Sequence, residues 1–480
     1  MTKTVWWVVS LFSVLFLAAS SLWAIPPYHA SIKDITDVKE VIDDPAPFYI
    51  ETNYFKQFIP DEAWEQLIHD PEESKAAWEK ALGFRSTDLV GKIAPEIKPG
   101  KYTLADKEKH PFKELMTEYH YKRFNAPGTE GLPNHIGMYT DIEVIETQQL
   151  WYAKPLAEAT LENMGKTQLD EEGYIKPETY ISGFPFPRPS GEHVPMQLLY
   201  NWQKRFKDHE NTANYDLTIG VNSRGKIDHR GTAHYMVLRL EGRVLLPPYG
   251  WFDDRAKKNG EEQIRMFTIF SPRDLFGNIY HITAYNDPKK DRNFLAYVNF
   301  LRRIRKLSST DSQDQAVGQD ISFDDAEGFS QALRPDRYPY VTRVIAEREF
   351  LVPAYTFDAS DYMDSKDGWK WKKLKFERRP MWVIEMVQQD KNYLYSKRVG
   401  YFDKETLLPQ LWELYDQKGR YYRTIDRVWG MVVPMGYINS VHNNNCDWLD
   451  THCTLTFGPA YPALWIDRKD MSLRSMMKAK

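Results

Sequence analysis

The sequence predicts a mainly β (α+β) protein whose body is one large, incurved antiparallel sheet. After Asn214 the chain carries about a dozen short stretches of alternating apolar and polar residues, separated by turn residues such as Asn222–Gly225. Few helical segments lie between these stretches, which argues against repeated βαβ units and a parallel sheet. Aromatic residues make up 14% of the chain, and this composition favours broad strands over a Leu-rich helical bundle.

The first residues have the features of an export signal. Lys3 supplies a positive charge, an apolar run extends from Val5 to Ala19, and Ala24 fits the position before a cleavage site. The run is shorter than the ~20 residues that span a bilayer, so we expect a cleaved signal peptide over residues 1–24 and an exported protein. The net charge of −4 argues against a general nucleic-acid-binding protein, and no nucleic-acid partner is expected.

Residues 25–200 are expected to form a helical, Pro-interrupted region that wraps around the sheet. Asp61–Leu82 has the apolar spacing of two helices separated at Pro71. The alternating prolines of Gly183–Glu192 force an extended connector. Further helices are expected over Lys113–Arg123, Ile145–Met164 and Val194–Lys207. The sheet domain is then expected over residues 201–470, with a tail at 471–480.

The expected strands share alternating or continuous apolar patterns bounded by turn residues. They are Tyr215–Val221, Ala233–Val244, Gln263–Ser271, Asn278–Tyr285, Tyr338–Ile345, Arg348–Val352, Met381–Val387, Tyr393–Phe402, Gln410–Tyr415, Tyr421–Asp426, Val428–Val433, Gly436–Val441 and Thr454–Phe457. A single sheet of this size should curl, and its concave side must then be covered or occupied. Either helices fill that side completely, or an apolar cavity stays partly open.

Alternation along three strands selects the residues expected to line such a cavity. These are Met236, Leu238, Leu240, Ile264, Met266, Phe270, Trp382, Ile384 and Met386.

The stretch Leu301–Phe329 combines basic and acidic residues. Arg302, Arg303, Arg305 and Lys306 end a strand region, and a polar loop then leads to the acids Asp320, Asp324 and Asp325. Ser322 precedes Asp325 by three residues, the spacing of a helix N-cap with an acidic third residue. The arginines and acids form either a structural ion-pair network that pins the loop or a site for an anionic ligand. Acid–base catalysis is a third alternative.

Two further features lie downstream. Trp369, Trp371, Lys372 and Lys373 mix aromatic rings with cations, which suits an anionic lipid surface or polyanionic ligand, or else a lysine-protected edge strand. Cys446 and Cys453 are expected to form a disulfide in an oxidising compartment. A zinc site with the nearby histidines is disfavoured, because the spacing matches no standard ligand set, and we expect no metal.

Motifs of common enzymes are missing from the sequence. It contains no Gly-x-Ser-x-Gly elbow, His-Glu-x-x-His pair, phosphate loop, Gly-x-Gly-x-x-Gly fingerprint or Cys-x-x-Cys pair. We therefore assign no catalytic residue and no cofactor. A hydrolase or lyase that uses scattered acids stays open as a third hypothesis, and it predicts a pocket with a strongly perturbed carboxylate.

Several runs together resemble the exported family called domain of unknown function 1329, within the outer-membrane lipoprotein-sorting superfamily. They are Gly183–Glu192, Phe270–Gly277, Tyr297, Arg302–Arg305, Gly318–Asp325, Gly400–Asp403, Glu413–Gly419 and Trp429–Pro434. The resemblance implies a half-barrel sheet that cradles helices, with an apolar cavity for acyl chains. It also implies a periplasmic protein, with an inner-membrane exporter or an outer-membrane protein as a partner.

The leading hypothesis is thus a periplasmic, non-enzymatic carrier or chaperone for a lipid or other amphipathic molecule. The alternative is a scaffolding or interaction protein of an envelope complex, in which the wrapping region and the Trp/Lys patch contact partners or the membrane surface.

Overall fold

The computed structural model describes residues 61–126, 138–205, 209–308, 311–334, 338–355, 362–364, 370–372, 375–458, 460–464 and 466–474. The predicted signal peptide lies outside these residues, as do Trp369 and Lys373 of the predicted patch. Trp371 and Lys372 belong to strand β11 (Lys370–Lys372), which pairs with β10 (Tyr362–Asp364) as a separate two-stranded sheet. None of the helices in the described residues is long and apolar enough to cross a membrane.

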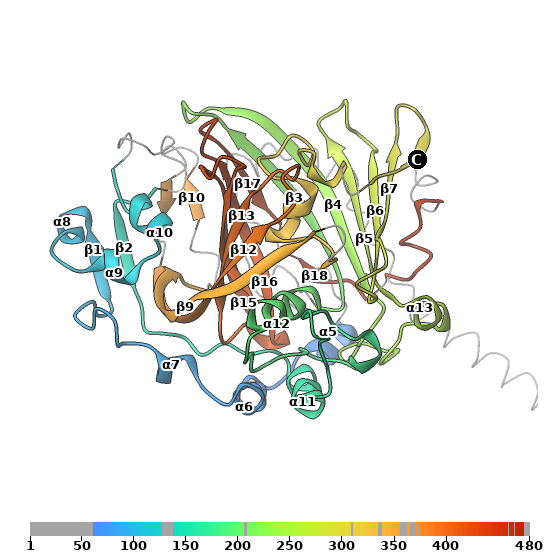
Figure 1. Ribbon diagram of the computed structural model, residues 1–480, viewed down its shortest axis with the longest axis horizontal. Helices are drawn as coiled ribbons and strands as arrows, with labels where there is room; N and C mark the ends of the chain where they lie inside the picture. Colours follow the sequence, from blue (N-terminus) through green and yellow to red (C-terminus); the bar gives the residue numbers. More distant parts are fainter. Residues whose placement is uncertain are drawn as a thin grey trace, which may run out of the picture.

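A 16-stranded sheet forms the body of the protein and confirms the predicted fold class (Figure 1). The order is β1-β2-β12-β13-β14-β15-β16-β17-β3-β4-β5-β6-β7-β8, with β9 paired to β12 and β18 to β3. Its pairings are antiparallel except for the short parallel contact between β2 and β12. The strands are β1 (Gly100–Thr103), β2 (Asp141–Val144), β3 (Asn211–Val221), β4 (Ile227–Arg239), β5 (Glu261–Ser271), β6 (Ile279–Tyr285), β7 (Asn293–Val298), β8 (Arg303–Lys306), β9 (Tyr340–Pro353), β12 (Lys375–Gln388), β13 (Lys397–Asp403), β14 (Pro409–Tyr415), β15 (Tyr421–Val432), β16 (Tyr437–Asp447), β17 (His452–Phe457) and β18 (Tyr461–Pro462).

Helices are concentrated before the long strands. They are α5 (Asp61–Leu67), α6 (Pro71–Leu82), α7 (Ser86–Leu89), α8 (Leu104–Lys107), α9 (Phe112–Leu115), α10 (Glu118–Arg123), α11 (Lys154–Asn163), α12 (Val194–Gln203) and α13 (Asp254–Asn259), with 3₁₀ turns η2 (Pro177–Thr179), η3 (Asp311–Gln313), η4 (Phe323–Gly328) and η6 (Val433–Met435). The break at Pro71 is confirmed, since the Asp70 carboxylate caps α6 by accepting from the amides of Glu72 and Glu73 at 2.8 and 3.1 Å. The helix predicted to begin at Ile145 begins only at Lys154, because Pro155 sets the first turn of α11.

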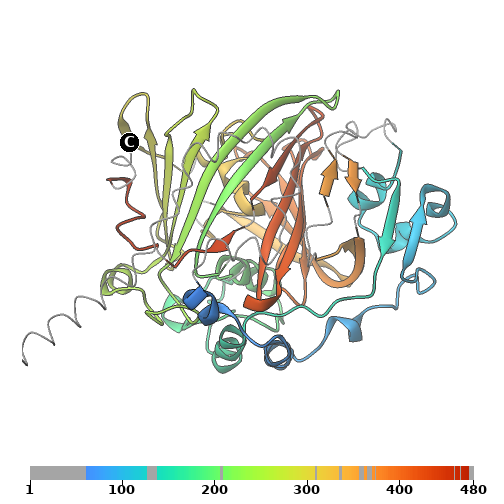
Figure 2. The same cartoon turned by 180° about the vertical axis from the view of Figure 1, so that it is seen from behind.

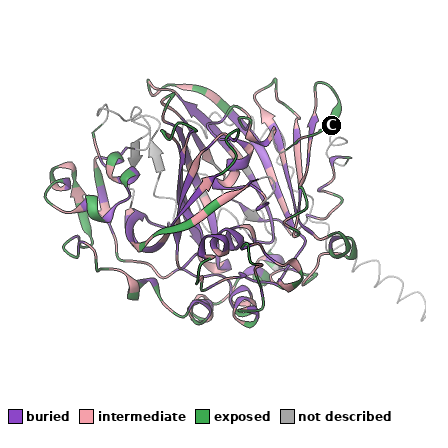
Figure 3. Cartoon of the chain, viewed as in Figure 1, coloured by how far each residue is buried: buried purple, intermediate pink, exposed green. Residues whose placement is uncertain are grey.

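Each face of the sheet carries a hydrophobic core. The outer face carries a core that joins Met236, Met266 and other strand residues to Ile466 and Met471 of the C-terminal segment. The inner face carries a second core, in which Ile384 and Trp412 pack with Trp202 of α12. Figures 1 and 2 show α6, α11 and α12 along one side of the sheet, with β1, β2 and α8–α10 at its end. Figure 3 shows that the strands are mostly buried and that exposed residues gather on helices and loops.

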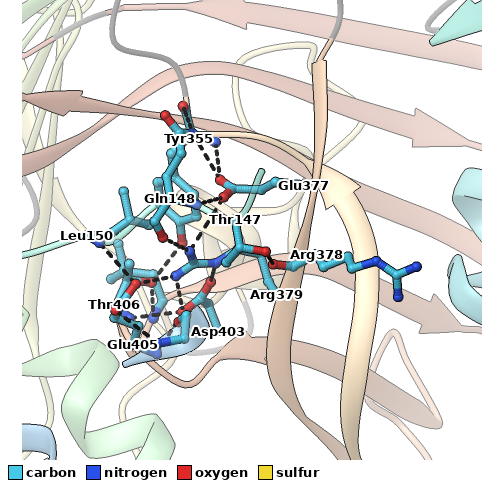
Figure 4. A network of polar contacts seen from close by, with 12 residues as sticks. Thr147, Gln148, Leu150, Tyr355, Glu377, Arg378, Arg379, Asp403, Glu405 and Thr406 are labelled. Carbon is cyan, nitrogen blue, oxygen red and sulfur yellow. Dashed lines mark hydrogen bonds and ion pairs between the residues drawn. The ribbon is translucent and has the colours of Figure 1, made fainter. Parts of the chain in front are cut away.

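A buried charged cluster attaches the N-terminal region to the sheet (Figure 4). Arg379 of β12 donates to Asp403 at 2.6 Å, to Glu405 at 2.7 Å and to the carbonyl of Gln148 at 2.7 Å. Glu377 accepts from the amide of Gln148 at 2.8 Å, and Glu405 accepts from the amide of Leu150 at 3.0 Å. Glu377 and Glu405 therefore each lie within ion-pair distance of Arg379 and also accept from a backbone amide of the N-terminal region.

Candidate functional site: an amphipathic cavity on the inner face

A cavity of about 170 Å³ lies on the inner face of the sheet. Its walls come from β3–β7, from β15–β17 and from the segment 311–334 that covers them. Strands as far apart in the sheet as β7 and β15 line the same space, so the sheet curls around it. The lining residues are Asn214, Asp216, Thr218, Tyr235, Arg265, Met266, Phe267, Tyr280, Ile282, Phe294, Ala316, Val317, Gln319, Ile321, Phe323, Asp325, Ala326, Glu327, Gly328, Ser330, Ile425, Arg427, Asn439, Ser440, Asn443, Asn445, Thr456, Gly458 and Ala460.

One wall of the cavity is aromatic. Tyr235, Phe267 and Tyr280 lie opposite one another on adjacent strands, so their rings stand in a row on the same face. Phe323 of η4 packs against this wall, with its ring centroid 5.1 Å from that of Tyr280 and 5.4 Å from that of Phe294. These separations are typical of favourable aromatic pairs.

A second wall is polar. Cross-strand pairing sets Arg427 of β15 beside Asn443 of β16, Asn443 beside Thr456 of β17, and Thr456 beside Thr218 of β3. All four residues line the cavity. The sheet register therefore places a continuous row of hydrogen-bonding side chains on β15–β17 and β3, next to the strands β4–β6 that carry the aromatic row.

Arg427 is the most unusual member of the polar row. Its side chain is buried, and the guanidinium lies over the ring of Trp429 at 4.5 Å and the ring of Trp202 at 5.7 Å. Nη2 donates to the hydroxyl of Ser440 at 2.8 Å, whereas Nε and Nη1 have no acceptor in the described part of the chain. Burial lowers the pKa of Arg427 to about 9, which is the direction expected for a cation removed from water without a carboxylate against it.

The carboxylates of the lining have other partners. Glu327 of η4 forms ion pairs with Arg205 and, at 3.3 Å, with Arg265, and it accepts from the hydroxyl of Tyr235 at 3.3 Å. Asp325 forms an ion pair with Arg398 at 2.8 Å. Asp216 of β3 accepts from the side chain of Asn214 at 2.6 Å and attracts Arg427 only from beyond ion-pair distance.

A second hollow of about 320 Å³ adjoins the first. The two share Ile282, Phe294, Phe323 and Ser330, and the second extends to Arg292, Asp324 and Tyr338. Burial raises the pKa of Asp324 to about 6, although Tyr393 and Gln331 donate to its carboxylate at 2.9 and 3.1 Å. One perturbed carboxylate of the kind that the hydrolase hypothesis predicts is therefore present, but its donors come from residues that hold the covering segment.

Three sets of hydrogen bonds hold the covering segment in place. Ser322 and Asp325 form the predicted capping box, in which the Ser322 amide and hydroxyl donate to Asp325 at 2.9 and 2.7 Å. The hydroxyl of Tyr395 also donates to Asp325, at 2.6 Å. Asp320 accepts from His452 at 2.6 Å and from Thr454 at 2.7 Å, and these hydrogen bonds join the covering segment to β17.

The predicted link between the basic and acidic residues of this stretch is wrong. Arg302, Arg303 and Arg305 are exposed at β8, and in the described residues no ion pair joins them to Asp320, Asp324 or Asp325. The acids are buried and meet Arg398, Tyr393 and His452 instead, because the loop folds inward over the sheet while β8 stays at its edge.

The predicted cavity lining is corrected in the same way, since Met266 alone of the nine residues lines the cavity. Met236, Leu238, Leu240, Ile264 and Phe270 belong to the outer-face core. Trp382, Ile384 and Met386 do face inward, but there the space is filled by side chains from the helices. The two alternatives therefore apply to different parts of the sheet, because the inner face is filled over β12–β14 and borders the cavity over β15–β17 and β3–β7.

The predicted disulfide is confirmed. Cys446 and Cys453 are bonded and lie directly opposite each other on β16 and β17. The bond joins two strands that contribute to the polar wall.

Comparison with solved structures finds similar chains at low sequence identity. A domain named for outer membrane lipoprotein sorting, from Vibrio parahaemolyticus, is 14% identical over 56% of this chain and 92% of its own, with a TM-score of 0.39. A DUF1329 family protein from Desulfovibrio piger is 13% identical over 56% and 91%, with a TM-score of 0.39. A LolA superfamily protein from Nitrosomonas europaea is 13% identical over 56% and 93%, with a TM-score of 0.33.

Comparison with curated proteins gives no match. The model of the family described as "Protein of unknown function (DUF1329)" matches residues 120–456, which is most of the chain and includes both walls of the cavity. The chain belongs to this DUF1329 family.

Proposed function

We propose that the protein is a periplasmic, non-enzymatic carrier or chaperone that holds a lipid or another amphipathic molecule in the inner cavity. The observation that carries the proposal is the division of one hollow into an aromatic wall and a polar wall. An amphiphile has the same division, and transferring its tail from water to apolar surroundings is favourable. A molecule with this task would serve an exporter or an outer-membrane partner, because its cargo is poorly soluble in the aqueous gap.

The size of the space supports the same proposal. The two adjoining hollows of about 170 and 320 Å³ together reach the range of about 300–1,000 Å³ that is usual for small-molecule sites. Ile282 lies where they join, and its side chain is only half-buried.

The test is equilibrium binding of a fluorescent fatty-acid probe to the purified protein and to Ile282→Trp. The larger side chain should fill the junction and weaken binding at least about tenfold, because each 1.4 kcal/mol lost is a factor of ten. Ile304→Trp is the matched control: it introduces the same side chain on the same sheet, at an exposed position of β8 outside both linings. Binding that is equally strong in all three proteins would refute the cavity as the site.

A second candidate, an interaction protein of the envelope, is favoured by one observation. Strand β9 pairs with β12 and, apart from one bridge between Leu351 and Met116, with no other described strand, and it exposes Val341, Val344 and Ile345. Exposed apolar residues on an edge strand are suited to pairing with another chain. This reading predicts that Val344→Lys with Ile345→Lys removes cross-links to a partner in intact cells and leaves probe binding unchanged.

A further inference from the structure

Arg427 is a buried cation without a carboxylate at ion-pair distance in the described residues, and Asp216 attracts it only from farther away. In the described residues it makes no ion pair, whereas buried Arg379 and Arg398 each contact at least one carboxylate directly. A buried charge without a partner is expensive, so a fold keeps one only where something else compensates for it.

Two of the three guanidinium nitrogens of Arg427 have no hydrogen-bond acceptor in the described part of the chain. The indole of Trp429 occupies its face, and Ser440 accepts from Nη2. Nε and Nη1 are the two nitrogens left without an acceptor among the described residues. Gly328 of the covering turn, at φ 97°, passes beside Nη1: a Cβ at this position would lie 3.7 Å from Nη1 and 3.0 Å from the ring of Trp412.

Two neighbours on the same wall also have unused hydrogen-bonding atoms. The side-chain oxygen of Asn445 and the hydroxyl oxygen of Thr456 have no partner in the described part of the chain. Both residues line the cavity, and both side chains carry a group that can donate a hydrogen bond. Arg427 and Thr456 lie on either side of Asn443 in the cross-strand row.

We infer that Arg427, with Asn443 and Thr456 beside it, binds the anionic oxygens of an amphiphile whose apolar tail lies against the aromatic wall of Tyr235, Phe267 and Tyr280. This inference rests on the proposed function and names its ligand class, an oxyanion head on an apolar chain. The N–H groups of Nε and Nη1 that lack acceptors can donate charge-assisted hydrogen bonds to the oxygens of a carboxylate or a phosphate. A neutral head would leave Arg427 without a counter-charge in direct contact.

The experiment compares acidic and neutral probes on the full chain. The ligands are a fluorescent fatty acid, the alcohol with the same chain, and a lysophosphatidic acid used as a competitor. The proteins are the wild type, Arg427→Met, Arg427→Lys and the control Arg305→Met, which replaces an exposed arginine of β8. We expect the wild type to bind the acid more tightly than the alcohol. Arg427→Met should weaken acid binding by roughly ten- to a hundredfold and change alcohol binding little, since a hydrogen bond to a charged group is worth about 1.5–3 kcal/mol.

Further outcomes distinguish a carboxylate head from a phosphate head. They also distinguish failure of the anion-binding site from failure of the proposed carrier function. Arg427→Lys keeps the charge but loses the planar guanidinium with its larger number of donors, so its affinity for the acid should lie between those of the wild type and Arg427→Met. Stronger competition by the lysophosphatidic acid than by the fatty acid would identify phosphate as the head group, and the reverse would identify carboxylate. Equal binding of acid and alcohol by the wild type, or unchanged acid binding by Arg427→Met, would overturn this inference and leave the proposed function standing. Binding of neither amphiphile would remove both.

The unfolding midpoint in urea provides the folding control. Arg427→Met should unfold at the same or a higher urea concentration than the wild type, because methionine removes an uncompensated buried charge. A large loss of stability would show that Arg427 has a structural role instead, and this result would also count against the inference.

Discussion

Replacing Arg379 by methionine should destabilise the protein more than almost any other single substitution on β12. The guanidinium is fully buried and lies within ion-pair distance of three carboxylates, those of Asp403, Glu405 and Glu377, at 2.6, 2.7 and 3.6 Å. Removing one partner of a buried ion pair typically costs about 3–5 kcal/mol, because the other charge stays behind in a poorly solvated site. With three acids left behind, we expect a loss near 5 kcal/mol in the free energy of unfolding at pH 7.

Urea unfolding, followed by tryptophan fluorescence, measures this loss. Burial already raises the pKa of Glu377 and of Glu405, and without Arg379 these acids should take up protons more readily. The destabilisation should therefore shrink as the pH falls from 7 to 5. Arg343→Met is the matched control: Arg343 also contacts a glutamate, Glu385 at 2.7 Å, but its side chain is 68% exposed. That control should cost less than about 1 kcal/mol, as for exposed ion pairs.

A loss below about 1 kcal/mol in the free energy of unfolding for Arg379→Met, or a loss equal to that of Arg343→Met, would contradict this prediction. It would mean that the three acids are neutral in the native state and that their contacts with Gln148 and Leu150 hold the N-terminal region without the cation.

Two pH-dependent predictions follow from groups around the covering segment. The carboxylates of Asp320 and Asp228 raise the pKa of His452 to about 9 from 6.5, so the stability that His452 provides is complete below pH 6.5 and is lost as the pH rises through 9. The urea midpoint of the wild type should fall between pH 7 and pH 9.5, and a similar fall in His452→Gln would contradict the assignment. Burial raises the pKa of Asp324 to about 6 from 3.8, which favours the protonated native form, so stability should be lost as the pH rises from 4 to 7. The wild type should lose up to about 3 kcal/mol over this range relative to Asp324→Asn, and parallel curves for the two proteins would rule this out.

Local sequence patterns predicted much of the fold. Alternation and turn residues located most of the strands, although two pairs of predicted strands are single strands, β9 and β15. The capping box of Ser322 and Asp325 could be predicted because both partners lie within three residues. The short strands β1 and β2 carry too few residues for a pattern, and their place beside β12 depends on tertiary packing.

The cavity could not be predicted in the same way, because alternation separates two faces without telling which one is open. On β4 and β5 both faces are apolar: Tyr235 and Phe267 face the cavity, and Met236 and Ile264 face the outer core. The C-terminal segment that covers the outer face follows these strands by about two hundred residues, so no local pattern reveals it.

The buried arginines of the inner contacts and the cavity could not be predicted for a related reason. Arg379, Arg398 and Arg427 lie inside strands, and their partners come from distant segments, as when Arg398 meets Asp325. A basic residue at an inward position of a strand with buried neighbours is the one signal that the sequence offers. The exposed arginines at 302, 303 and 305 are easier to recognise in the sequence, because they cluster along the chain.

Native mass spectrometry of the protein purified from its own cell envelope would show whether the cavity holds an amphiphile. We expect a folded protein that carries one amphiphile, released on denaturation as an acidic lipid, and we expect Ile282→Trp to be isolated without it. A wild-type protein that is isolated only in its ligand-free mass, and that takes up no fatty-acid probe afterwards, would contradict the proposed function.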